Sequence, residues 1–179
     1  SIQLDYALRV MPGIKEIEYL TYDRKPDQRF ESMFDGRCLI RHSMEANDAV
    51  SRSDIVITAT PGAGALFDLE AVAPGTHLNC VGADTRGKRE LPEGLIAKAR
   101  VVVDDINQAT QIGETQWAPE VPVIEIGDLL TGRQVFTREA QDISVFDMTG
   151  LALQDLTVAR LLFKQAKNES IGHDISWPW

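Results

Sequence analysis

The sequence has little of what metal sites and disulfide scaffolds require. Its 179 residues include only 2 cysteines and 3 histidines, and the histidines show no metal-ligand spacing, so we expect no metal. Cys38 and Cys80 stand alone rather than in a CxxC pair. Lone cysteines are typical of free thiols in a reducing compartment, which predicts a cytoplasmic protein.

Long apolar runs, basic residues and hydrolase motifs are also scarce. No run approaches the roughly 20 apolar residues that cross a bilayer, so we expect no membrane partner. The 18 Lys and Arg are outnumbered by 27 Asp and Glu, giving a net charge of −9. Because nucleic-acid binders need a basic face, we expect no nucleic-acid partner. Neither a GxSxG motif nor a P-loop occurs, and nothing indicates a nucleophilic triad.

The composition that remains, 44% hydrophobic and 25% charged, is that of a globular protein with room for one core. Short apolar runs rich in Val and Ile alternate with helical patterns. This alternation predicts an α/β fold, a doubly wound parallel sheet with helices on both faces. The predicted strands are 17–23, 37–43, 54–60, 77–83, 100–105, 121–126 and 143–147. The predicted helices are 2–11, 26–33, 43–52, 91–99, 107–113 and 151–167.

Ligands of such sheets bind beyond the carboxyl ends of the strands, so the residues there are candidates. Asp23 follows the first run, where an acidic residue can bind ribose hydroxyls, although a solvated turn residue before Pro26 explains it more simply. TATPGAG, residues 58–64, offers small residues and hydroxyls against which a flat ligand could lie. A Gly-Pro turn without a ligand is the alternative interpretation.

Two further strand ends carry polar residues. In NCVGADTRGK, residues 79–88, Gly82 and Gly87 permit close approach or positive φ, and Asp84 stands near Arg86 and Lys88. A carboxylate beside cations suits general acid/base chemistry, and a salt bridge in a surface loop is the alternative interpretation. ISVFDMTGLALQD, residues 143–155, joins a strand end to a helix start, which indicates either an anion contact or a capped helix.

Four stretches taken together resemble the ornithine cyclodeaminase and mu-crystallin family, whose members are nicotinamide-dependent enzymes acting on amino acids and imines. They keep the family's order and approximate spacing over nearly the whole chain. They are DIVITATP at 54–61, PGTHLNCVGADTRGKREL at 74–91, ARVVVDD at 99–105 and VFDMTGLALQDL at 145–156.

The resemblance implies a Rossmann domain over residues 1–150 that binds NAD(H) or NADP(H). It also implies a C-terminal helix and tail, 151–179, that return to a substrate and dimerisation domain of a homodimer. The family's catalytic carboxylate falls on Asp84. Asp23 corresponds to the acidic ribose ligand, which favours NAD over NADP, although Arg24 could accommodate a phosphate. The expected cofactor-binding residues are Asp23, Arg24, Thr58, Ala59, Thr60, Val81, Gly82, Ala83, Lys88, Met148 and Thr149.

Departures from the family pattern concern one side chain and the N-terminal part. Met148 stands where the family commonly has Ser, so a hydroxyl contact is lost there, while Thr149 is kept. The Gly-rich pyrophosphate turn and the strand before it are absent, as are the substrate-binding Arg and Lys residues of the N-terminal domain. Because a missing central strand leaves ladder groups unpaired, we expect an N-terminal segment or a companion chain to supply it.

A carboxylate at the position of Asp84 would serve several related reactions. It could stabilise the iminium formed when hydride leaves the Cα of an amino acid, activate an attacking water or amine, or protonate an imine. Cyclodeamination, amino-acid dehydrogenation and imine reduction therefore all remain open. The alternatives are a non-catalytic protein of the mu-crystallin type that binds a nicotinamide cofactor or small ligand, and a doubly wound domain of unrelated function.

Overall fold

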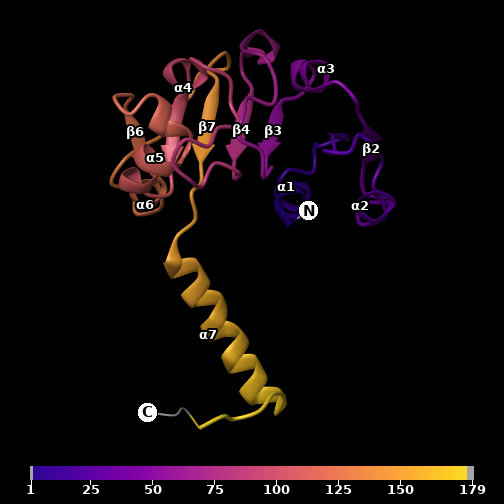
Figure 1. The fold of residues 1–179 in the computed structure, drawn as a ribbon, viewed down its shortest axis with the longest axis vertical. Helices are drawn as coiled ribbons and strands as arrows, with labels where there is room; N and C mark the ends of the chain where they lie inside the picture. Colours follow the sequence, from indigo (N-terminus) through magenta and orange to yellow (C-terminus); the bar gives the residue numbers. More distant parts are fainter. Residues whose placement is uncertain (1, 177–179) are drawn as a thin grey trace.

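The structure, a computed structural model, describes residues 2–176; residues 177–179 of the predicted tail lie outside that range. Five parallel strands form the main sheet in the order β3-β4-β7-β5-β6 (Figure 1). Their bounds are β3 Ile55–Thr58, β4 His77–Cys80, β5 Arg100–Val103, β6 Val123–Glu125 and β7 Ser144–Asp147. The strand that comes last in the chain, β7, lies at the centre and pairs with β4 and β5. This architecture confirms the predicted Rossmann-like α/β class.

Apolar side chains of these strands form the core, which explains why near-continuous Val and Ile runs predicted them. Leu78, Val103 and Val145 are completely buried, and Leu91 and Leu95 cover them from the segment that follows β4. Burying a side chain of this size stabilises the fold by about 1.5–3 kcal/mol. The core therefore fixes the carboxyl ends of β3, β4, β7 and β5 side by side.

A second, two-stranded sheet stands apart from the main sheet. β1 (Glu16–Tyr19) pairs in parallel with β2 (Leu39–His42) and with no strand of the main sheet within residues 2–176. It lies beyond β3, next to α1, on the side of the main sheet opposite β6 (Figure 1). β1 and β3 each keep one edge without a ladder partner among the described strands. The two sheets are separate because no described strand lies between β1 and β3 to join their ladders.

The expected helices are present, most of them shorter than predicted. Their bounds are α1 Ile2–Val10, α2 Gln28–Ser32, α3 Ala46–Ser51, α4 Leu95–Lys98, α5 Ile106–Ile112 and α7 Ala152–Glu169. The sequence did not predict α6 (Ile126–Leu130) or the 3₁₀ turns η1 (Leu69–Ala71) and η2 (Glu114–Trp117). Among the described residues, no helix is both long and apolar enough to cross a membrane.

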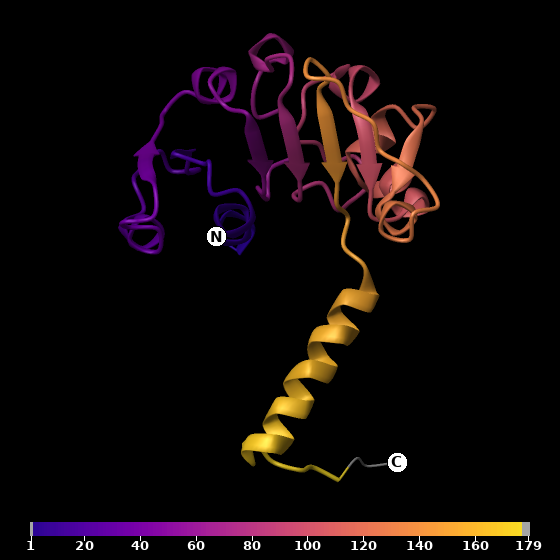
Figure 2. The same cartoon turned by 180° about the vertical axis from the view of Figure 1, so that it is seen from behind.

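Helix α7 projects away from the sheet, as both views show (Figures 1 and 2). None of its 18 residues is buried. Large apolar side chains are nevertheless frequent on it, and Leu153, Leu161 and Phe163 are 64–69% exposed. A helix that exposes this much apolar surface has the composition of one that packs against other protein.

Candidate functional site

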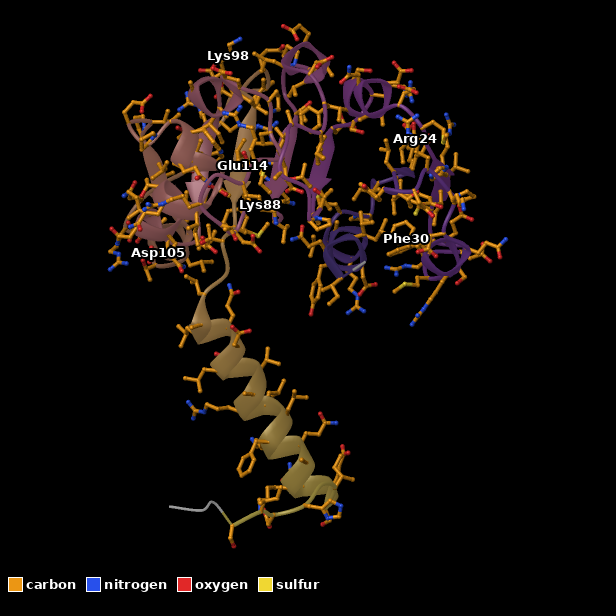
Figure 3. All side chains as sticks on the ribbon, viewed as in Figure 1. Arg24, Phe30, Lys88, Lys98, Asp105 and Glu114 are labelled. Carbon is orange, nitrogen blue, oxygen red and sulfur yellow. The ribbon has the colours of Figure 1, made fainter. Side chains whose placement is uncertain are left out.

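The site is built where the parallel strands end. Since β3, β4, β7 and β5 are neighbours and run in one direction, the residues that follow them share one edge of the sheet. Lys88 and Asp105 lie toward this edge, to which the strand arrows point (Figure 3). The structure therefore brings together most of the predicted site residues, which are Thr58, Ala59, Thr60, Val81, Gly82, Ala83, Asp84, Lys88, Met148 and Thr149.

Asp84 and Lys88 form an ion pair in the loop after β4. Lys88 Nζ lies 3.1 Å from Asp84 Oδ1, which also accepts a hydrogen bond from the Thr85 hydroxyl at 3.1 Å. The Lys88 side chain is 16% exposed and that of Asp84 is 55% exposed, so the carboxylate is open to an incoming molecule. The hydrogen bond from Lys88 lowers the pKa of Asp84 below its ordinary value. Asp84 is therefore a carboxylate at neutral pH and can accept a proton.

Glu90 joins the loops that follow β3 and β4. Its buried carboxylate accepts hydrogen bonds from Thr60 N at 2.5 Å and from Gly82 N at 3.0 Å. A Cβ on Gly82 would collide with the same carboxylate. Gly82 is thus required by its contact with Glu90, whereas Gly87 adopts a positive φ of 80°.

A second buried carboxylate, Asp147, anchors η2 to the end of β7. Asp147 accepts from Glu114 N at 3.1 Å, from Thr115 N at 2.8 Å and from the Thr115 hydroxyl at 2.7 Å. Burial raises the pKa of Asp147. The Glu114 side chain turns to the loop after β4 and accepts from Glu90 N at 2.5 Å and Leu91 N at 3.3 Å. Burial raises the pKa of Glu114 to about 7.

Asp104, directly after β5, holds the turn that follows β7. Its carboxylate accepts from Thr149 N at 2.9 Å, from the Thr149 hydroxyl at 2.9 Å and from Gly150 N at 2.7 Å. The Thr149 hydroxyl therefore donates within the protein and presents only its acceptor lone pairs to a ligand. The neighbouring Met148 donates its backbone N–H to Cys80 O at 2.9 Å and is half-buried.

Asp23 and Arg24 lie apart from this group, in the two-stranded unit beyond β3 (Figure 3 labels Arg24). Both are exposed. Asp23 lines an open cavity of about 570 Å³ with Thr21 and Lys25. Arg24, at a φ of 57°, lines a neighbouring cavity of about 380 Å³ between the end of β1, α3 and residues 65–68.

One buried polar atom at this edge has only a weak partner. The Thr58 side chain, at the end of β3, is 3% exposed, and its hydroxyl has the Cys80 thiol of β4 as its only partner among the described residues. A thiol is a weak hydrogen-bond partner, so a hydroxyl that has no other at the edge where ligands bind fits a stronger partner supplied by a ligand. Within residues 2–176, no group of three or more His, Cys, Asp or Glu side chains could hold a metal ion.

Sequence reasoning missed the polar groups that support the site, namely the buried Asp104, Glu90, Glu114 and Asp147 and the half-buried Gln116. Asp104 and Asp147 stand at or just after strand ends, a position that could have been noticed. Glu90, Glu114 and Gln116 carry no local signal, because most of their partners lie 8 to 33 positions away along the chain.

A parallel sheet whose strand-end loops carry hydroxyls, an open carboxylate and glycine turns defines a Rossmann-like binding domain. The chain belongs to the ornithine cyclodeaminase/mu-crystallin family, whose model matches residues 2–170. This match confirms the resemblance carried by the four stretches of the sequence.

The chain is similar in sequence to characterised enzymes and in fold to solved structures. It is 34% identical over 178 residues to alanine dehydrogenase of Archaeoglobus fulgidus, covering 96% of this chain and 55% of the relative. The structure of an archaeal alanine dehydrogenase dimer with bound NAD superimposes with a TM-score of 0.85 at 33% identity, covering 98% of this chain and 56% of that one. The structure of the iminosuccinate reductase of Paracoccus denitrificans in complex with NAD+ superimposes with a TM-score of 0.84 at 26% identity, covering 98% of this chain and 56% of that one. The chain thus spans about half the length of the relatives it matches.

Proposed function

We propose that this chain is the cofactor-binding part of an NAD-dependent enzyme that acts on an L-amino acid or its imine. The observation that carries the proposal is the Asp84–Lys88 pair, an open carboxylate of lowered pKa at the end of β4. Dehydrogenation, imine reduction and cyclodeamination all need such a group beside the reacting nitrogen. The alanine dehydrogenase and iminosuccinate reductase relatives support a reaction at an amine or imine carbon.

The residues present fit a nicotinamide dinucleotide. The Thr58 hydroxyl, exposed Ala59 and half-buried Thr60 would contact the nicotinamide end, with Val81 to Ala83, Met148 and Thr149 on the adjacent strand ends. Asp23 would accept hydrogen bonds from the adenosine ribose. A bound nicotinamide would supply hydride transfer to or from the substrate carbon.

Asp84 would act on the substrate nitrogen and on water. As a carboxylate it would stabilise the positive charge of an iminium and accept a proton from an attacking water or amine. In the reductive direction the same oxygen would first take up a proton from water and then pass it to the imine nitrogen, which returns Asp84 to its ionised form. Lys88 would hold the Asp84 carboxylate in place and keep it ionised between turnovers.

Further polypeptide completes this unit in the proposed enzyme. The free edges of β1 and β3 would pair with one additional parallel strand, supplied by an N-terminal segment or a companion chain. Residues 1–150 would then form one dinucleotide-binding domain. The exposed apolar side chains of α7 would pack on a substrate and dimerisation domain, giving a homodimer.

Asp84→Asn in the complete protein tests the function, because the amide keeps the shape and removes the proton acceptor. We expect kcat with an amino-acid or imine substrate to fall by about 10²–10⁴-fold, with the Kd for NADH little changed. Asp48→Asn, at an exposed position of α3, is the matched control and should retain activity. Wild-type kcat in Asp84→Asn would exclude the mechanism. NADH binding by a wild-type protein without turnover on such substrates would favour the non-catalytic binding protein.

A further inference from the structure

The loop that carries the proposed acid/base group has little support of its own. Asp84, Thr85, Arg86 and Gly87 are all exposed. Within the turn, one backbone hydrogen bond, Lys88 N to Thr85 O at 3.0 Å, closes the chain on itself. A loop with so few internal contacts needs an outside partner to keep a fixed geometry.

That partner is the side-chain amide of Gln116 on η2. Its Oε1 accepts a hydrogen bond from Gly87 N at 2.7 Å. Its Nε2 donates to Lys88 O at 3.2 Å and to Gly113 O at 2.8 Å, and it lies 3.4 Å from Thr85 O. One half-buried amide therefore uses its donor and its acceptor to connect the turn to η2.

The neighbours of Gln116 reinforce the same connection. Trp117 Nε1 donates to Lys88 O at 3.2 Å, and the Arg89 guanidinium lies 4.2 Å from the centre of the Trp117 ring. Glu114 accepts from the backbone of Glu90 and Leu91, immediately after the turn. η2 is itself fixed to the end of β7 through the buried Asp147.

We propose that Gln116 is a positioning residue for the acid/base reaction: its amide fixes the Thr85–Lys88 turn so that the Lys88 ammonium stays against Asp84 Oδ1. The inference rests on the proposed function, in which Asp84 is the proton acceptor. Gln116 is not a catalytic residue, since it acts only through the backbone of the turn. No aliphatic or acidic side chain of this length offers both an N–H donor and an acceptor.

Gln116→Met and Gln116→Glu in the complete protein test the inference. Met keeps the length and removes every hydrogen bond, whereas Glu keeps the acceptor for Gly87 N and sets an oxygen against Lys88 O and Gly113 O. For each variant we expect kcat to fall by roughly 10- to 100-fold, as misplacement of a reacting group does, with the Kd for NADH within about twofold of wild type. The acidic limb of the kcat/KM pH profile should move upward, because a loosened Lys88 no longer lowers the pKa of Asp84.

Gln111→Met is the matched control, since Gln111 is exposed on α5 and its side chain makes no hydrogen bond to a described residue. Unchanged kcat and pH profile in folded Gln116→Met, or in Gln116→Glu if the first variant does not fold, would overturn the positioning role. Asp84→Asn in the same assay separates the two claims. If Asp84→Asn loses kcat and the Gln116 variants do not, only the positioning role fails; if Asp84→Asn is active, the proposed function fails.

Discussion

The Glu90 carboxylate occupies the space in which any side chain at position 82 would begin, so Gly82 and Glu90 form one packing unit. Gly82→Ala should therefore displace Glu90 and break its hydrogen bonds to Thr60 N and Gly82 N. With donors and a carboxylate left unpaired in the interior, we expect the free energy of unfolding to fall by at least about 3 kcal/mol. Urea denaturation measures the loss.

Gly127→Ala is the control for that experiment. Gly127 lies exposed on α6, and a Cβ there would meet nothing within 4 Å. We expect the control to be neutral or to stabilise the protein by about 0.5–1 kcal/mol. Equal effects of the two substitutions would contradict the packing explanation for Gly82.

The contribution of Glu114 to the free energy of unfolding should decrease as pH rises. An ordinary ion-paired carboxylate, whose pKa is lowered in the folded protein, does the opposite. Between its ordinary pKa of 4.5 and the folded value of about 7, Glu114 stays protonated in the folded protein and ionises in the unfolded chain. Its contribution to the free energy of unfolding therefore falls as pH rises through this window, by up to about 3 kcal/mol. Above pH 7 the loss is complete.

Glu114→Gln removes this titration and keeps an acceptor for Glu90 N and Leu91 N. The difference in unfolding free energy, variant minus wild type, should increase from pH 4.5 to pH 7.5. Denaturation at both pH values measures it, with exposed Glu120→Gln as the control. A difference that is constant across this window would show that Glu114 is ionised in the folded protein at both pH values.

Lys88→Met should raise the pKa of Asp84, because the hydrogen bond from Lys88 is the main cause of its lowering. The acidic limb of the kcat/KM profile should shift to higher pH. Lys98→Met serves as the control, since Lys98 lies at the opposite edge of the sheet (Figure 3). An unshifted limb would mean that Asp84 is not the group whose ionisation limits the reaction.

Asp23→Ser should weaken discrimination against NADPH. A carboxylate beside the adenosine ribose repels a 2′-phosphate, and Arg24 next to it can pair with one once the carboxylate is gone. We expect the ratio of the Kd values for NADPH and NADH to fall roughly tenfold or more, measured by nucleotide fluorescence titration. Asp35→Ser, an exposed acidic residue elsewhere in the two-stranded unit, should leave the ratio unchanged. Tighter NADPH than NADH binding by the wild type would overturn the cofactor preference.

The strands could be predicted because each buried strand is a short local run of apolar residues. All seven apolar runs overlap a strand, and the 77–83 run extends past His77–Cys80 to Gly82, whose N–H donates to the Glu90 carboxylate rather than to a neighbouring strand. The division into two sheets has a different origin, since it depends on which strands become neighbours rather than on any one run. Asp84 and the strand-end residues were found from position and family pattern. Gln116 and Glu114 were not, because their importance comes from contacts with loops about 24 to 31 residues away.

The central place of β7 has a consequence for biosynthesis. β7 pairs with β4, whose partner residues lie 67 positions earlier, and with β5, 44 positions earlier. As the chain leaves the ribosome, β4 and β5 are therefore made well before the strand that joins them, and their facing edges stay open until residue 147 has emerged. Such non-local pairing makes folding slow and exposes strand edges to wrong partners in the meantime. Substitutions that weaken β7 are therefore expected to lower the yield of folded protein in the cell more than they lower the stability of what has folded.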